Sequence, residues 1–196
     1  MATLATHKAL ALLSATIAVA VLTAIVLLLA GGKPAEARVS GALGARCRGT
    51  LDWNSGFAGE PRAQTFTATR TGRLTDARLR LSRLGNAKGG VRVQIRPVDP
   101  STGAPASLVL ASTRIPRTAI GTGSSFRRAF AHFGRRSAPR VVSGRSYALV
   151  MRARNGYYVA GTDSGCRGGF YIAPRSGTPF TQVSGDLLFA AFVVRR

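Results

Sequence analysis

The chain has 196 residues, and 28 lysines and arginines against 7 aspartates and glutamates give it a formal net charge of +21. A hydrophobic content of 45% excludes a disordered polar chain, and two cysteines exclude a zinc site built mainly from thiolates. The length suits one globular domain together with a targeting segment.

The chain begins with a long apolar run. Residues 9–30 carry no charged side chain and could cross a hydrocarbon core of about 30 Å as a helix. Ala35 and Ala37 are small residues that a signal peptidase accepts. We therefore predict that residues 1–37 are a cleaved signal peptide or a signal-anchor helix that contacts the membrane, with a buried core helix as the remaining alternative. Both favoured readings place the rest of the chain on the extracellular face of the cell membrane or secreted.

Residues 38–61 are the least regular part, because glycines interrupt them repeatedly. We expect a linker and an N-terminal segment that packs on the domain, since Trp53 and Phe57 need cover. Strand patterns begin immediately afterwards, so a β-sandwich domain is predicted for residues 62–196.

The segment 74–97 alternates with period two, which indicates β-strands. Leu79 and Leu81 alternate with polar residues, mostly arginine, in its first half. Val93 and Ile95 alternate with Arg92, Gln94 and Arg96 in its second half. Glycine-rich residues 85–90 separate the halves, so an antiparallel hairpin is expected. Its exposed face would carry Arg78, Arg80, Arg92 and Arg96.

Short alternating segments continue to the end of the chain. None after the leader shows the 3.6-residue period of a helix, and no repeat of fixed length is visible. Eight or nine short strands in one domain predict an all-β, antiparallel sandwich or barrel. Besides the 74–97 pair, the predicted strands are 63–69, 108–115, 125–133, 146–153, 157–159, 170–172 and 187–194.

Several of these segments resemble a bacterial extracellular module of the "choice-of-anchor" type. The resemblance runs from Ala63 to Val194 and implies a jelly-roll-like β-sandwich that follows a signal peptide or is tethered by an anchor. Members that accompany polysaccharide-active enzymes bind sugars or space other domains, so the resemblance implies no single ligand. It rests on the motifs Gln64-Thr65-Phe66-Thr67-Ala68, Gly72-x-Leu74-Thr75, Gly103-x-Pro105, Ser143-Gly144-x-x-Tyr147 and Gly185-Asp186-Leu187-x-Phe189.

Cys47 and Cys166 are the two cysteines. Cysteines of an exported domain usually pair, so we predict a disulfide that ties the N-terminal segment to the sandwich, with two free thiols as the alternative.

The excess of arginine predicts an anionic partner, because planar guanidinium groups suit carboxylates and phosphates. Outside a cell the anions at hand are wall polymers, acidic polysaccharides, lipid headgroups and stray DNA. A solvated basic surface without a ligand is the alternative. Aromatic side chains near loops could add a sugar-stacking platform or belong to the core. They are Trp53, Tyr157, Tyr158 and Tyr171.

Catalytic patterns are missing. His132 is the one histidine after the leader, no Gly-x-Ser-x-Gly elbow is present, and no pair of acids stands out for glycoside hydrolysis. Asp52, Asp163 and Asp186 are candidates for a calcium site, although their spacing matches no EF-hand and turn aspartates are the simpler interpretation. We predict neither a cofactor nor enzymatic activity.

Together these patterns predict a non-catalytic binding or adhesion module of the cell envelope, exported or membrane-tethered, that contacts an anionic polymer or polysaccharide. Two alternatives stay open: a structural spacer without a ligand, and a secreted hydrolase that uses His132. Nucleic acid is not an expected partner, because no recognised nucleic-acid motif is present. The oligomeric state is left open.

Overall fold

The computed structural model describes residues 41–195. The predicted leader, its apolar core at 9–30 and its cleavage site all lie outside this range. Among residues 41–195 no helix is both long and apolar enough to cross a membrane.

The described chain is all-β and forms two sheets, with one 3-10 turn at Arg117–Ala119. The strands pair antiparallel, apart from a two-residue parallel contact between β4 and β7, so the predicted antiparallel sandwich is confirmed. Sheet A contains β1 (Ala42–Cys47), β15 (Phe189–Val194), β4 (Gly72–Arg83), β11 (Tyr157–Thr162) and β14 (Asp186–Leu187), with β2 (Trp53–Phe57), β7 (Gly121–Thr122), β8 (Arg127–His132) and β9 (Arg140–Val141) paired beside them. Sheet B contains, in order, β13 (Thr181–Val183), β12 (Phe170–Ile172), β3 (Arg62–Thr67), β10 (Ser146–Arg152), β5 (Val91–Pro97) and β6 (Ala111–Ile115).

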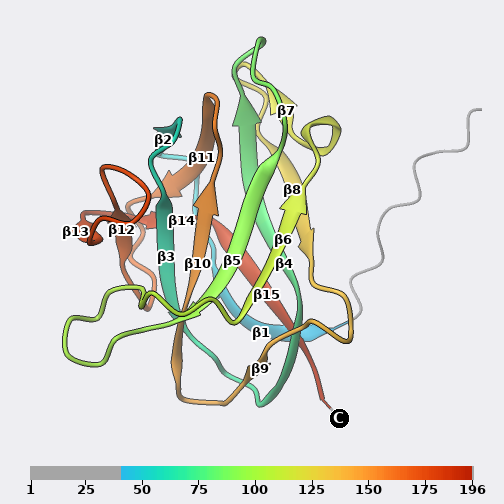
Figure 1. Cartoon of the computed structure of the whole chain (residues 1–196), viewed down its shortest axis with the longest axis vertical. Helices are drawn as coiled ribbons and strands as arrows, with labels where there is room; N and C mark the ends of the chain where they lie inside the picture. The colour runs from blue at the N-terminus through green and yellow to red at the C-terminus, as the bar shows by residue number, and fades with distance from the viewer. Residues whose placement is uncertain (1–40, 196) are drawn as a thin grey trace, which may run out of the picture. The chain divides into compact units, whose positions relative to one another are not determined.

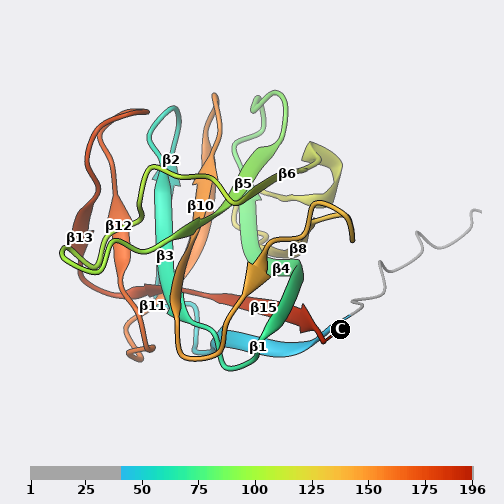
Figure 2. The same ribbon diagram turned by 60° about the horizontal axis from the view of Figure 1, so that its bottom comes forward.

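The core lies between the sheets. In Figure 1, β3, β10 and β5 run side by side in front of β15 and β1, and the turned view of Figure 2 separates the two layers. Leu79 and Leu81 of β4 and Val93 and Ile95 of β5 have no exposed surface. On these two strands the apolar alternate residues point inward and the arginines between them point outward, as period two requires.

The predicted hairpin between β4 and β5 is wrong. β4 pairs with β15, β8 and β11, whereas β5 pairs with β10 and β6, so residues 84–90 carry the chain from sheet A to sheet B. Each strand has one apolar face, and in a two-layer sandwich the two faces cover each other across the core. The arginine rows of β4 and β5 therefore point to opposite outer faces of the domain.

A small second cluster lies on the outer face of sheet B. Ala63, Ala148, Val150 and Tyr171 form its buried floor, and Val98, Ala104 and Phe180 pack over them. The loop after β5 thus covers part of this face and leaves the part nearer β6 open.

Candidate anion-binding site

Three arginines form a row across the outer face of sheet B. Arg92 of β5 lies directly opposite Arg114 of β6 on one side and Arg152 of β10 on the other. Opposed like charges on neighbouring strands destabilise a sheet, and opposed residues of a ladder have Cβ atoms only about 5 Å apart. The register therefore concentrates three positive charges where packing alone would favour neutral side chains.

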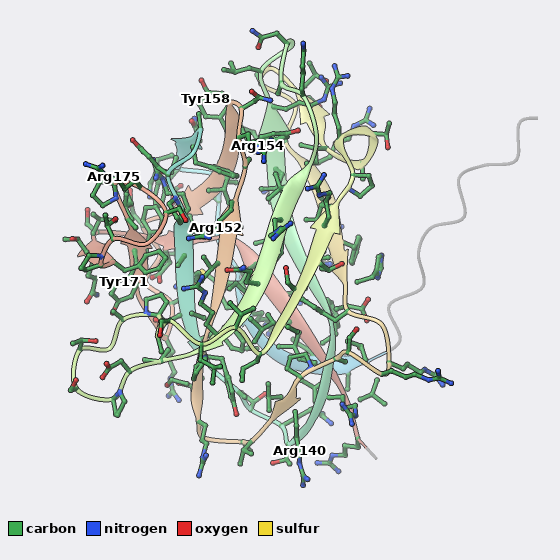
Figure 3. The ribbon with its side chains drawn as sticks, in the orientation of Figure 1. Arg140, Arg152, Arg154, Tyr158, Tyr171 and Arg175 are labelled. Atoms are coloured by element: carbon green, nitrogen blue, oxygen red, sulfur yellow. A yellow bond between two sulfur atoms is a disulfide. The ribbon has the colours of Figure 1, made fainter. Side chains whose placement is uncertain are left out.

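A groove of about 720 Å³ opens over this row. Lys88 and Arg154, from the turns at the same end of the sheet, add two more cations, and no acidic residue lines the groove. Figure 3 shows Arg152 and Arg154 following one another along and just beyond β10. We call the depression that these five cations line the sheet-B groove. Its other lining residues are Gly59, Gly89, Gly90, Ala153, Asn155 and Ser176.

Hydrogen bonds hold the turns that frame this groove. The Asn155 amide donates to the carbonyl of Lys88 at 3.0 Å, and the buried Tyr157 hydroxyl donates to the carbonyl of Gly89 at 2.7 Å. Burial is the main cause that raises the pKa of Tyr157, so its hydroxyl keeps its proton and remains a donor. Because both bonds reach the backbone, the Lys88 turn is fixed beside the arginine row.

One arginine of the row has unused hydrogen-bonding capacity. The Nε atom of Arg152 is buried and has no hydrogen-bond partner within the described part of the chain. A buried unpaired donor costs roughly 1–3 kcal/mol.

Arg96 has a different role from Arg92, although both lie on the same face of β5. Arg96 donates to Oε1 of Gln94 through Nε at 3.1 Å and Nη2 at 2.7 Å, and to the carbonyl of Ala106 through Nη1 at 3.2 Å. Burial, followed by the charge of Arg152, lowers its pKa. Arg96 is thus a structural clamp on the loop after β5.

A second depression, of about 580 Å³, continues from the sheet-B groove. The two share Arg152 and Ser176. Phe180, Pro179 and Asp99 are among its other lining residues, so it mixes apolar and polar surface. An elongated ligand could run from the cationic groove into this less charged extension.

The four arginines predicted to share one face are divided between the two outer faces. Arg78 and Arg80 belong to β4 of sheet A, whereas Arg92 and Arg96 belong to β5 of sheet B. The expectation failed because it assumed that β4 and β5 pair with each other. Arg114 and Arg152, which complete the row, were missed, because only the register of three strands aligns them.

The four aromatic candidates do not form a common platform. Trp53 stacks on Phe170 with ring centroids 5.3 Å apart, and Tyr157 is fully buried. Tyr171 is 5% exposed on β12, and Tyr158 lies on β11 of the other sheet, well separated from it in Figure 3. Packing accounts for three of them, because Trp53 and Tyr157 belong to the core between the sheets and Tyr171 belongs to the small cluster on the outer face of sheet B.

The predicted disulfide is confirmed. Cys47 and Cys166 are bonded, with their Cα atoms 5.5 Å apart, and the bond joins β1 to the loop before β12. The bond closes a large loop, because the two cysteines are 119 positions apart in the sequence.

The three aspartates proposed for calcium accept hydrogen bonds from the protein. Asp52 Oδ2 accepts from the hydroxyl of Thr162 and the backbone N–H of Asp163, both at 2.9 Å. Asp163 accepts from the indole N–H of Trp53 at 2.8 Å, and Asp186 accepts from the backbone N–H of Cys166 at 2.7 Å. Residues 41–195 contain no group of three or more histidine, cysteine or acidic side chains placed to hold a metal.

His132 has an acidic neighbour that the sequence did not reveal. Its Nδ1 lies 2.5 Å from Oδ1 of Asp76, which is directly opposite on β4, and its ring stacks on Phe130. A histidine–aspartate pair needs a nucleophile for acyl transfer. Within residues 41–195 no serine or cysteine hydrogen-bonds to His132, and the pair lies on the face opposite the sheet-B groove.

No protein-family model matches this chain, and no curated protein matches it. The choice-of-anchor resemblance therefore stays a prediction. Two solved structures of Cwp84, a surface-layer-associated cysteine protease of Clostridium difficile, are similar in fold. One contains its cysteine protease and lectin-like domains, with a TM-score of 0.47 and 13% identity over 73% of this chain and 36% of that chain. The other is a variant of the protease after propeptide cleavage, with a TM-score of 0.49 and 13% identity over 74% of this chain and 38% of that chain. This chain spans little more than a third of their length, and at these values neither likeness establishes a shared function.

Proposed function

We propose that this chain is a non-catalytic, cell-surface binding module that holds an anionic polysaccharide in the sheet-B groove. The observation that carries the proposal is the row of Arg114, Arg92 and Arg152 on three neighbouring strands. Its opposed positive charges cost stability in the free domain. A bound anion screens these charges from one another, so relief of their repulsion contributes to the free energy of binding.

The lining of the sheet-B groove favours a carboxylated or sulfated polymer. Guanidinium groups present forked donors that match the paired oxygens of carboxylate and sulfate. The groove continues into the depression at Phe180, where an uncharged sugar ring could rest against apolar surface. A polymer whose charged groups alternate with neutral sugar surface fits a cationic groove that continues into a less charged depression.

The predicted export of the domain supports an extracellular polymer as the partner. A leader at 1–37, cleaved or retained as an anchor, would display the sandwich outside the cytoplasm, where acidic polysaccharides are abundant. A jelly-roll-like module of the choice-of-anchor type is the architecture that we propose for it. Nucleic acid remains an unexpected partner, since no nucleic-acid motif accompanies the basic surface.

A polymer-binding panel tests the proposal. The full-length protein is titrated with polygalacturonate, dextran sulfate, neutral dextran and double-stranded DNA. The double variant R92Q/R114Q removes two exposed arginines of the row, and R135Q/R136Q removes the same charge from an exposed loop outside the groove. We expect tight binding to at least one acidic polysaccharide, none to neutral dextran, and at least a tenfold loss of affinity confined to R92Q/R114Q. Equal affinity of the wild type and R92Q/R114Q for every polymer would refute the proposal.

A further inference from the structure

A second cationic cluster lies on the outer face of sheet A. Arg80 of β4 is directly opposite Arg128 of β8, which repeats on this sheet the opposed like charges of the sheet-B row. Arg78, two residues earlier on the same face of β4, and Arg48, just after β1, complete the cluster. These four side chains line a depression of about 400 Å³, "the sheet-A groove", which contains no acidic residue.

The charges of the sheet-A groove are incompletely compensated. The Nε atom of Arg80 is buried and has no hydrogen-bond partner in the part of the chain that the structure describes. Burial lowers the pKa of Arg78, and the positive charges of Arg128 and Arg48 lower it further. The nearest acid on this face of β4, Asp76, is engaged with His132. An added oxyanion would relieve the repulsion among these positive charges.

Covalent and aromatic contacts fix the positions of these arginines. Cys47 lines the groove, and its disulfide to Cys166 holds the end of β1 from which Arg48 projects. The Arg78 guanidinium carbon lies 5.9 Å from the centroid of the Phe192 ring, a cation–π contact that orients the side chain. The Arg78 side chain and the backbone that leads to Arg48 are therefore positioned before any ligand arrives, which reduces the entropy lost on binding.

We propose that the sheet-A groove is a second anion-binding site, which takes a sulfate, phosphate or carboxylate group of a polymer, and that the domain uses its two grooves to bridge two anionic chains. The inference rests on the proposed function for the sheet-B groove. The hydrophobic core separates the grooves, and sheets of a sandwich lie about 10 Å apart before their outer side chains are counted. One short polymer segment therefore cannot fill both, whereas two chains can be held on opposite faces.

Stoichiometry and bridging test this inference with two lengths of one polymer. Full-length wild-type protein, R48Q/R128Q, R92Q/R114Q and R135Q/R136Q are titrated with a heparin hexasaccharide by calorimetry and mixed with long-chain heparin in a turbidity assay. All three variants lose two exposed arginines, so their net charge is the same. We expect two hexasaccharides per wild-type chain and one per chain for R48Q/R128Q. Wild type and R135Q/R136Q should cross-link long heparin, with turbidity that peaks at an intermediate ratio, whereas R48Q/R128Q should not.

The outcomes separate this inference from the proposed function. One hexasaccharide per wild-type chain, or unchanged bridging by R48Q/R128Q, overturns the second site and leaves the sheet-B groove standing. Unchanged binding by R92Q/R114Q overturns the sheet-B groove instead. Equal losses in all three variants would show that total charge is responsible, and would overturn the second site.

Discussion

Gln64 of β3 donates a hydrogen bond to Asp186 of β14 at 2.6 Å, and this bond joins the two sheets through the interior. Gln64 has no exposed surface and Asp186 is 6% exposed. The same amide accepts from the backbone N–H of Leu187 at 2.6 Å, and the carboxylate accepts from the N–H of Cys166. Gln64 and Asp186 therefore bond to each other and also pair the backbone N–H groups of Leu187 and Cys166, the second of which belongs to the disulfide.

Substitution of this carboxylate should be costly. Asp186→Ala would remove the acceptor of the Cys166 N–H and one of the two acceptors of the Gln64 amide, which keeps the carbonyl of Thr65. A buried donor that is left unpaired costs about 1–3 kcal/mol. We expect the free energy of unfolding in urea to fall by about 2–4 kcal/mol. Asn54→Ala, at an exposed position of β2, should change it by no more than about 0.5 kcal/mol. A loss for Asp186→Ala no larger than that of Asn54→Ala would contradict the inter-sheet role.

Acid should weaken the anchoring of the segment before β2. Hydrogen bonds from Thr50, then Asp163 and Thr162, lower the pKa of Asp52. A carboxylate with a lowered folded pKa contributes stability that is present above its unfolded pKa of about 3.9 and is lost as pH falls through the folded value. The melting temperature should therefore drop below about pH 4, and the drop should be smaller in Asp52→Asn. Superimposable pH profiles of the two proteins would exclude this contribution.

Gly161 is required by its neighbour Trp53. A Cβ atom at position 161 would lie 2.3 Å from the indole ring, so Gly161→Ala must displace Trp53 from its stack on Phe170. We expect a loss of about 1–3 kcal/mol in unfolding free energy, typical of overpacking, with a red shift of tryptophan emission. Trp53 is the single tryptophan of the chain, so the emission reports on this site alone. Gly85→Ala, where a Cβ meets nothing within 4 Å, is the matched control.

Arg96 and Arg92 should respond oppositely to the same substitution. Arg96→Gln would break the clamp on Gln94 and Ala106, so amide hydrogen exchange in the loop 98–106 should accelerate and stability should fall by about 1–2 kcal/mol. Arg92→Gln removes repulsion from Arg114 and Arg152, so stability should hold or rise while polyanion affinity falls. If Arg92→Gln destabilised the domain as much as Arg96→Gln, the division of roles would be wrong.

Local patterns predicted the strands but not their partners. The alternation around Leu79 and around Ile95 indicated which side chains enter the core, and burial agrees with it. Period two fixes the face of a strand and leaves its neighbour open, since the residues between β4 and β5 suit a hairpin turn and a crossing between sheets equally well. The pairing of Cys47 with Cys166 was predictable from the predicted export together with the presence of two cysteines.

The candidate site depended on information that no local pattern contains. Arg92 was found because its strand alternates clearly, but Arg114 and Arg152 enter the row through the register of β6 and β10. The contact of His132 with Asp76 likewise exists because β8 pairs with β4 across a separation of 56 residues. Long-range register, set by the burial of all strands together, determined both.

The salt dependence of acidic-polysaccharide binding tests the central claim most directly. Affinities of the full-length wild type and of R92Q/R114Q for dextran sulfate are measured between about 50 and 300 mM NaCl. Each charge that the protein neutralises on a dense polyanion contributes about 0.7–0.9 to the slope of log affinity against log salt concentration. Loss of two contacts should make the slope of R92Q/R114Q shallower by roughly 1–2. The same slope and the same affinity for both proteins would show that the row of arginines on sheet B does not hold the polymer.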